Sequence, residues 1–420
     1  MTHMDPTIAS EAFRTFRPTT LAVDDINLAS NDTFMRPDIE GIFDKLRREK
    51  PVSWHQHPDS GSQGFWSVVR YDDIMAVNRD AATFSNQQGI QVMIENDPPR
   101  AGKGSMIEMD PPQHSRYRKI VAGAFTSSAI AKLELKIRTR VHSTLDAIGD
   151  KKHFDYLEEF ATPIPLGVFY DFMGVPVEDQ RKILDLADML FFSADPRMGG
   201  RQQAMQQAGA ELQAYGRDLA ERKRQQPGDD IMSAIANAVV DGERLTIEEL
   251  GAFFGLLGGA GADTTRATLG WTMEALSMFP DQKQLWLQDL DGRAAAAVEE
   301  CIRWASPTMH MRRTATRDAQ IAGQAVRAGE KLAVWFMSGN RDAAKFTNPY
   351  EFDITRAPNM HMAFGMGGPH FCLGAHLAKM ELRIALVELL RRFPTIRAQA
   401  PARRLRSNFI NGPYELPVAT

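Results

Sequence analysis

The stretch Phe364-Gly-Met-Gly-Gly-Pro-His-Phe-Cys-Leu-Gly374 decides the fold. It places Cys372 in a loop with four glycines, and the residues from Ala375 to Phe393 predict an amphipathic helix directly after it. Glycine allows positive φ and close approach of the backbone to a ligand. The free N–H groups at the start of a helix favour a thiolate. The pattern predicts an electron-rich sulfur in a rigid turn, suited to binding a metal through one thiolate.

Two other interpretations of Cys372 start from the same residues. The chain has 2 cysteines, Cys301 and Cys372, and no neighbouring His/Cys cluster completes a zinc site. A lone cysteine is often a small buried apolar residue. A cysteine hydrolase would need a histidine that activates the sulfur, and His370 lies close in sequence, but nothing else completes such a site. The glycine frame favours metal ligation over both.

A long helix is predicted upstream of this loop. Thr246-Ile-Glu-Glu249 forms a capping box, and the helix can run unbroken to Phe279, ahead of Pro280. Its middle reads Gly258-Gly-Ala-Gly-Ala-Asp-Thr-Thr265, although each glycine costs up to about 1 kcal/mol against alanine. Either a flat group lies against this face or the helix opens locally. Asp263 and Thr264 fit a proton relay beside a reacting centre or a kink with locally satisfied hydroxyls, and the residues alone leave both open.

Charged residues elsewhere form two weaker patterns. Glu300 and Arg303 lie at i, i+3 on one helix face, and Arg356 follows in an extended segment, so the three can form a buried Glu–Arg–Arg cluster. The second pattern is a set of basic and histidine residues suited to two carboxylates of a bound group: His114, Arg118, Arg313 and His370. Each residue taken alone is more often a surface residue.

Composition limits the classes of function. The chain has 420 residues, 43% hydrophobic and 24% charged, which is ordinary for a globular protein. A net charge of -4 argues against nucleic acid as the main partner. Two cysteines indicate a reducing cytoplasm, and the sequence contains neither a signal peptide nor a membrane span. We therefore expect a soluble cytoplasmic protein without a membrane anchor, mainly α with a smaller β-rich region (α+β).

The four motifs, in this order and spacing, resemble the cytochrome P450 family over nearly the whole chain. The resemblance implies a single domain over 1–420, in which roughly 1–110 and 315–360 contribute the β-rich lobe. It also implies haem b, iron protoporphyrin IX, held between the long central helix and the cysteine loop. The implied function is a haem-thiolate monooxygenase that hydroxylates an unactivated C–H bond with O2 and two electrons. The implied electron donor is a ferredoxin, with its reductase, or a flavodoxin, and the implied oligomeric state is a monomer.

The resemblance assigns roles residue by residue. Cys372 matches the thiolate ligand, and Asp263 and Thr264 match the acid–alcohol pair that delivers protons to bound dioxygen. The residues expected to contact the cofactor are His114, Arg118, Ala260, Arg313, Phe364, His370 and Gly374, and the expected structural triad is Glu300, Arg303 and Arg356. The substrate pocket is expected to be apolar and lined by Val92, Met93, Ala260, Met309, Phe409 and Ile410, of which Phe409 and Ile410 are equally well explained as core.

The cysteine loop differs from the common family form in one respect. Phe364 lies eight residues before Cys372, whereas the usual spacing is seven. The longer loop is similar to that of bacterial subfamilies acting on methyl-branched lipids, sterol side chains and monoterpenes, so we expect a substrate of this kind. Lys379 and Arg383 could present a positive face to an acidic ferredoxin, or form an ordinary solvated helix face. The alternative functions are a haem-binding sensor or carrier without turnover, and a peroxide-driven or desaturating enzyme.

Overall fold

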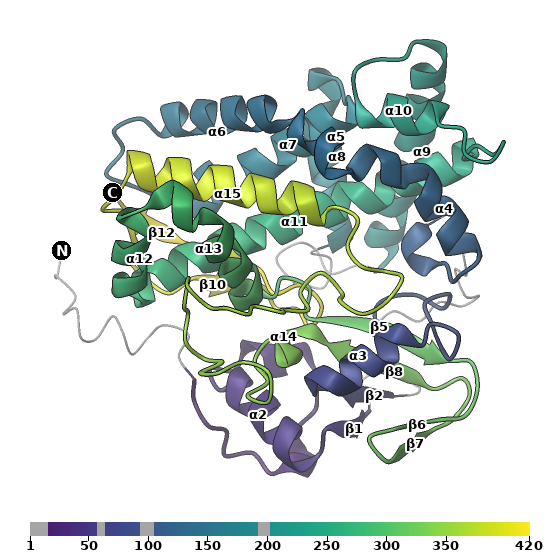
Figure 1. Ribbon diagram of the computed structural model, residues 1–420, viewed down its shortest axis with the longest axis vertical. Coiled ribbons are helices and arrows are strands. Elements are labelled where there is room, and N and C mark those ends of the chain that lie inside the picture. The colour runs from purple at the N-terminus through teal and green to yellow at the C-terminus, as the bar shows by residue number, and fades with distance from the viewer. Residues whose placement is uncertain (1–15, 57–63, 93–104, 192–201) are drawn as a thin grey trace.

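The computed structural model describes residues 16–56, 64–92, 105–191 and 202–420, and helices dominate them (Figure 1). The helices are α2 (Ile39–Glu49), α3 (Tyr71–Arg79), α4 (Gln113–Ala122), α5 (Ser127–Ala131), α6 (Glu134–Ile148), α7 (Pro163–Met173), α8 (Val177–Phe191), α9 (Gln202–Gln225), α10 (Ile231–Asn237), α11 (Ile247–Met278), α12 (Pro280–Leu287), α13 (Leu290–Ala305), α14 (Phe336–Gly339) and α15 (Ala375–Arg392). The strands are β1 (Val52–His55), β2 (Phe65–Val68), β3 (Phe84–Ser85), β4 (His153–Asp155), β5 (His310–Ala315), β6 (Ala319–Ile321), β7 (Gln324–Val326), β8 (Lys331–Trp335), β9 (Arg397–Ala398), β10 (Arg403–Arg404), β11 (Pro413–Glu415) and β12 (Pro417–Ala419). This confirms the expected mainly α class.

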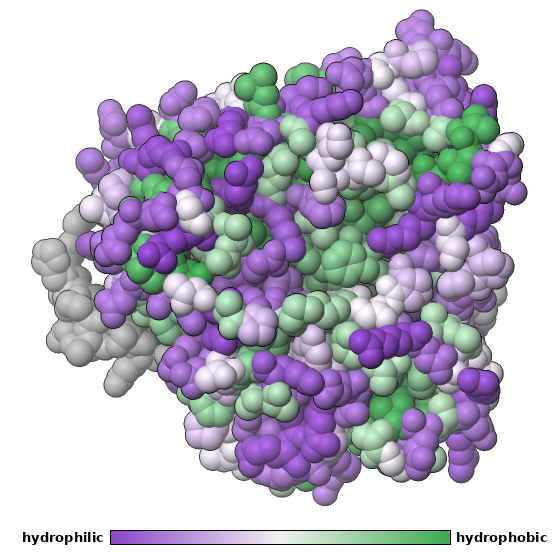
Figure 2. Space-filling view, in the orientation of Figure 1, coloured by the Kyte–Doolittle hydropathy of each residue, from purple (hydrophilic) through white to green (hydrophobic). Residues whose placement is uncertain are grey.

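The largest sheet joins the N-terminal part of the described chain to residues 310–335. Its strand order is β1-β2-β8-β5-β3, so three strands from the first hundred residues pair with two strands that follow residue 309. β2 runs parallel to β8, with Phe65 opposite Lys331, and β5 runs antiparallel to β8. Figure 1 shows this sheet in the lower part of the molecule with α2, α3 and α14, and most of the other helices above it. Figure 2 shows a mostly polar surface with apolar side chains gathered near the middle of the face, between these two parts.

α11 forms the central helix that the capping box predicts. The Thr246 hydroxyl accepts a hydrogen bond from the Glu249 N–H at 3.1 Å, and the Glu249 carboxylate accepts one from the Thr246 N–H at 2.8 Å. The helix continues through its glycines to Met278 without interruption. Its C-terminal half shares one buried core with α12, α13 and α15, to which Trp271, Trp286, Ile302 and Leu386 contribute. Each buried side chain of this size stabilises the fold by about 1.5–3 kcal/mol.

Membrane-spanning potential is low in the described helices. Among them, no single helix is long and apolar enough to cross a membrane. One pair, Leu157–Met173 and Val177–Ala187, meets the criteria of length and composition together but is bent by 120°.

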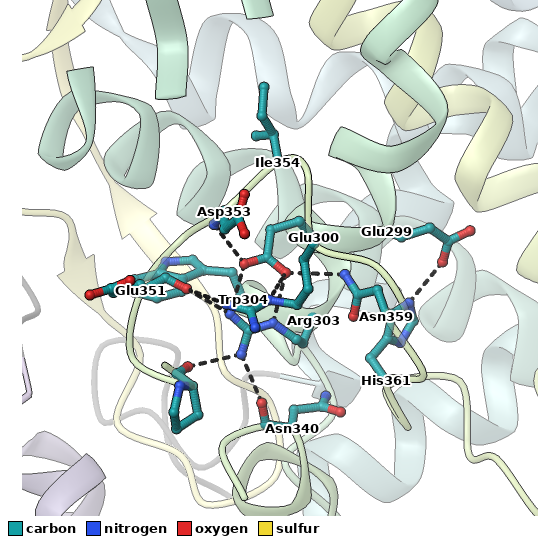
Figure 3. Close-up of polar contacts among 12 residues, drawn as sticks. Glu299, Glu300, Arg303, Trp304, Asn340, Glu351, Asp353, Ile354, Asn359 and His361 are labelled. Atoms are coloured by element: carbon teal, nitrogen blue, oxygen red, sulfur yellow. Dashed lines mark hydrogen bonds and ion pairs between the residues drawn. The ribbon is translucent and has the colours of Figure 1, made fainter. Parts of the chain in front are cut away.

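Glu300 organises the segment that leads into the cysteine loop (Figure 3). Its carboxylate and the Arg303 guanidinium form a bidentate pair at 2.7 and 2.8 Å, and both side chains are fully buried. The same carboxylate accepts hydrogen bonds from Arg356 Nε at 3.2 Å, from Asn359 Nδ2 at 3.1 Å and from the Asp353 backbone N–H at 2.8 Å. One buried anion on α13 therefore fixes residues 353–359.

We expect the Arg303→Met variant to lose about 3–5 kcal/mol of unfolding free energy, because it leaves the Glu300 carboxylate buried without its main partner. Urea unfolding measures this loss. Arg403→Met is the matched control, since Arg403 pairs with Glu415 at 3.0 Å with side chains 64% and 42% exposed. The control should lose at most about 1 kcal/mol. Equal losses in the two variants would contradict the central role of the buried pair.

Candidate functional site

A cavity lies between α11 and the cysteine loop, residues 364–374. The space that the centre of a water molecule can occupy in it is about 240 Å³. α11 contributes a stripe of residues at helical spacing: Phe253, Leu256, Leu257, Ala260, Gly261, Thr264, Thr265 and Thr268. The opposite wall contains Phe364, Gly365, Phe371, Cys372 and Gly374, and further wall residues come from α4, α7, β5 and α15. The described walls are mostly apolar, which suits a large hydrophobic ligand.

The backbone of the cysteine loop fixes the position of Cys372. The Cys372 N–H donates to the Phe364 carbonyl at 2.8 Å and so closes the loop. Gly367 has φ +99°, a conformation that residues with a Cβ atom rarely adopt. A Cβ atom on Gly368 would lie 2.2 Å from the carbonyl oxygen of Asn78, so the loop can approach α3 only with glycine here. The predicted need for glycines therefore has a specific steric cause at these two positions.

Opposing effects act on the Cys372 sulfur. Burial raises the pKa of the thiol, while the Gly374 N–H and the Arg118 guanidinium act to lower it. In the part of the chain that the structure describes, no group of three or more His, Cys, Asp and Glu residues can hold a metal ion. Cys301 lies in the core, where burial raises its pKa to about 12. Among the described residues, a metal at this cavity would therefore lack the three or four protein ligands of a zinc site, and Cys372 offers it a thiolate.

The four basic residues predicted to bind carboxylates converge on one end of the cavity. His114 and Arg118 lie on α4, Arg313 on β5 and His370 in the cysteine loop, and all four line the cavity. The His114 and His370 ring centroids are 4.2 Å apart. Burial, followed by Arg313, His114 and Arg118, lowers the pKa of His370 to about 2. Burial also lowers the pKa of Arg313 to about 10.

Two polar atoms at this basic end have unmet hydrogen-bonding capacity that suits an anionic ligand. His114 Nδ1 and His370 Nε2 are buried, and neither has a hydrogen-bond partner among the described residues. Buried polar atoms of this kind are costly unless a ligand, an ion or water pairs with them. Asp110 acts favourably on the charge of His114 and Arg313. A flat apolar macrocycle with two carboxylates and a metal centre, which is haem b, matches the apolar walls, the basic end and the single sulfur.

Asp263 and Thr264 face different voids, because consecutive helix residues point about 100° apart. Thr264 lines the large cavity, and its hydroxyl donates to the Ala260 carbonyl at 2.9 Å. Asp263 is buried and pairs with Arg266 at 3.2 Å. Both of these residues line a second, much smaller void between α11, α7 and α8. Thr264 alone of the predicted acid–alcohol pair therefore reaches the cavity directly.

Among the predicted substrate residues, Ala260 lines the cavity and Met93 lies outside the described residues. The other four are buried in neighbouring clusters instead: Val92, Met309, Phe409 and Ile410. For Met309, Phe409 and Ile410, the cause is long-range pairing between the segment after α13 and the C-terminal loop. The Met309 N–H donates to the Phe409 carbonyl at 2.8 Å, and the Asn411 N–H donates to the Pro307 carbonyl at 2.8 Å. In the described walls, Thr308 and Met311 take the places expected of Met309.

Sequence reasoning also missed Glu381 and most of the α11 stripe. Glu381 on α15 lines the cavity, and burial raises the pKa of its carboxyl well above the usual range. The stripe was detectable, because its members follow the i, i+3, i+4, i+7 spacing of one helix face. Lys379 and Arg383 do not form an uncompensated positive face: Lys379 pairs with Glu299 at 2.6 Å, and Arg383 lies 3.6 Å from Glu134.

Comparisons with known proteins find relatives over nearly the whole chain. Residues 294–413 match the family model described as Cytochrome P450. The chain is 39% identical over 410 residues to the methyl-branched lipid omega-hydroxylase of Mycobacterium tuberculosis (strain ATCC 25618 / H37Rv), with 96% of each protein covered. It is 32% identical over 401 residues to linalool 8-monooxygenase of Pseudomonas putida, with 93% of this chain and 98% of the relative covered.

A similar solved structure is the Mycobacterium marinum cytochrome P450 CYP268A2 in complex with pseudoionone. Its TM-score is 0.88 at 37% identity, and the match covers 96% of this chain and 100% of that structure.

The burial of His310 on β5 makes the free energy of unfolding depend on pH. It is fully buried, and its Nδ1 lies 2.9 Å from the Asn408 carbonyl oxygen. Burial lowers its pKa from 6.5 to about 4. Below pH 6.5 the imidazole of His310 therefore binds a proton in the unfolded chain, whereas in the folded protein it stays neutral down to about pH 4. The contribution of neutral His310 to the free energy of unfolding is thus fully present above pH 6.5 and is lost as the pH falls from 6.5 to 4. From pH 7 to pH 5 this residue should remove about 2 kcal/mol of unfolding free energy.

Urea unfolding at both pH values checks this expectation. His310→Gln should show a smaller loss between pH 7 and pH 5 than wild type, whereas the surface control His153→Gln should match wild type. An unchanged pH dependence in His310→Gln would show that His310 is not the group responsible.

Proposed function

The chain belongs to the cytochrome P450 family, and we propose that it hydroxylates an unactivated C–H bond of a hydrophobic substrate, first of all a methyl-branched lipid. It is a haem-thiolate monooxygenase, and its cofactor is haem b. The reaction consumes the substrate R–H, O2, two electrons and two protons, and it forms R–OH and water. The observation that carries the proposal is the apolar cavity that brings together Cys372, Thr264 and the basic residues.

Cys372 is proposed to ligate the haem iron, and His114, Arg118, Arg313 and His370 are proposed to hold the two propionates. Bound there, haem b would supply the activation of O2 and the insertion of one oxygen atom. The Cys372 thiolate would donate electron density to the iron. The glycines and the Phe364 carbonyl keep the sulfur in place. Arg118 and Arg313 would neutralise the propionates inside the protein, where an unpaired charge is costly. The neutral imidazoles of His114 and His370 would donate hydrogen bonds to them.

Thr264 is proposed to handle protons at the cavity. Its hydroxyl can donate to a ligand once it releases the Ala260 carbonyl, and it can then take a proton from the protein side. Asp263, the preceding residue on α11, is proposed to supply that proton from the smaller void that it shares with Arg266. The apolar stripe of α11 excludes water and positions the substrate carbon, which determines the site of hydroxylation.

The remaining proposals concern partners and organisation. We propose a ferredoxin with its reductase, or a flavodoxin, as the donor of the two electrons. The two cysteines are both free, which supports a reducing cytoplasm as the compartment. The chain is proposed to act as a monomer and as one domain, to whose sheet the first hundred residues and the residues near 310–335 contribute.

Thr264→Ala tests the proposed proton step. Product formed per electron pair should fall by about tenfold or more, and hydrogen peroxide should appear instead, because a positioned proton donor is typically worth 10²–10⁴ in rate. Quantifying product, peroxide and O2 uptake together measures this. Thr264→Ser should retain coupling, and so should Thr268→Ala, which removes a hydroxyl one turn further along the same cavity wall. Unchanged coupling in Thr264→Ala would contradict the role of this hydroxyl.

Substrate class is tested by optical titration of the ferric protein. We expect a high-spin shift with methyl-branched fatty acids, and compare it with sterol and terpenoid ligands. Ala260→Phe should abolish the shift, because the added ring fills the cavity beside Thr264. Val177→Phe, at a position that is 80% exposed, adds the same ring outside the cavity and should keep the shift. A shift that persists in Ala260→Phe would place the substrate elsewhere.

A further inference from the structure

Two consecutive glutamates on α13 have different tasks. Glu300 is fully buried and holds residues 353–359, as described above. Glu299 contacts His361, which follows the segment 353–359 that Glu300 holds (Figure 3). Its side chain is 31% exposed, so it lies at the boundary between the core and solvent. The triad accounts for Glu300 and leaves Glu299 without an assigned role.

Glu299 forms a cluster with His361 and Lys379, which we name the Glu299 cluster. His361 Nε2 lies 2.9 Å from Glu299 Oε2, and Lys379 Nζ lies 2.6 Å from Glu299 Oε1. Each carboxylate oxygen thus has its own partner. Burial acts to raise the pKa of Glu299, but the hydrogen bonds from His361 and Lys379 outweigh it and lower the pKa. Glu299 is therefore an anion with a cation beside it.

This cluster reaches Cys372 through one side chain, Phe364. Lys379 Nζ lies 5.4 Å from the centroid of the Phe364 ring, and the His361 ring lies 5.7 Å from the same centroid. The Phe364 carbonyl accepts the hydrogen bond from the Cys372 N–H at 2.8 Å, and Phe364 itself lines the cavity. The two opposite charges thus lie close to the apolar ring of Phe364, which belongs to the loop that carries Cys372, so water screens them from this loop incompletely.

We propose that Glu299 and Lys379 are positioning residues that set the reduction potential of the haem iron by acting with opposite charges on the Cys372 site. Reduction adds one negative charge to the iron. The Lys379 ammonium favours the reduced state of the iron, and the Glu299 carboxylate favours the oxidised state. The hydrogen bond with His361 and the ion pair with Lys379 hold the Glu299 carboxylate in place. This inference rests on the ligand role proposed for Cys372 and goes beyond it, because it assigns the control of electron transfer to residues outside the cavity.

Redox titration of the substrate-free, haem-loaded protein tests the proposal. Lys379→Gln should shift the reduction potential to a more negative value, and Glu299→Gln should shift it to a more positive value. The Glu299→Gln/Lys379→Gln double variant should lie between the two, near wild type. The glutamine at 299 keeps an acceptor for His361, so the charge is removed without removing the hydrogen-bonding group.

Arg391→Gln is the matched control. Arg391 lies on α15 as Lys379 does, is 46% exposed and pairs with acidic residues. It is twelve residues further along, about 18 Å at the rise of an α-helix. Loss of this distant charge should leave the reduction potential at the wild-type value.

A negative shift in Lys379→Gln together with a positive shift in Glu299→Gln, both larger than in the control, supports the proposal, and the reverse pair of signs overturns it. Shifts of the same sign, or shifts no larger than in Arg391→Gln, overturn it. If Glu299→Gln fails to retain haem, Lys379→Gln decides alone: a negative shift beyond the control supports the proposal and its absence overturns it. The carbon monoxide spectrum of each reduced sample reports thiolate ligation separately, so failure of the ligand assignment is distinguishable from failure of this inference.

Discussion

The hydrogen bond from the Cys372 N–H to the Phe364 carbonyl is the contact on which the rest of the site depends. It closes a loop whose glycines allow a positive φ at Gly367 and close approach to Asn78 at Gly368. The sulfur is thereby held at the start of α15 and faces α11 across the cavity. In the ligation proposed above, one protein atom would hold the metal, so further protein ligands could not correct its position. The scaffold around the loop must supply the rigidity.

Buried charged and polar residues have two tasks in this structure. One set makes the scaffold rigid, and the other set lines the basic end of the cavity. Glu300 and Arg303 satisfy each other in the core, and Glu300 also holds the chain segment that enters the loop. The basic end of the cavity is the opposite case, since two buried imidazole nitrogens there have no hydrogen-bond partner among the described residues. A buried polar group without a partner is costly. The first arrangement therefore stabilises the fold by itself, whereas the second would be completed by the anionic cofactor proposed above.

Local patterns predicted much of this structure, and long-range pairing explains what they missed. The capping box placed α11 within one residue at each end, and the cysteine loop preceded α15 as expected. The residues expected to contact the cofactor all line one cavity, to which α4, α11, β5 and the cysteine loop contribute them. Which residues of these segments line the substrate cavity depends on how residues 307–311 pair with residues 408–411, and no local sequence pattern specifies this pairing. The separation of Asp263 from the cavity and its i, i+3 pairing with Arg266 both follow from helix geometry, but the smaller void that the two residues line forms only when α7 and α8 pack against α11.

The carbon monoxide difference spectrum of the dithionite-reduced, haem-loaded protein, compared with that of Cys372→His, tests the central claim most directly. Ligation by the Cys372 thiolate predicts a strongly red-shifted Soret band in wild type and its loss in the variant, which retains a ligand of a different kind. A folded wild-type protein that binds haem without this band, or a variant that keeps it, would contradict thiolate ligation and the oxygenase mechanism together.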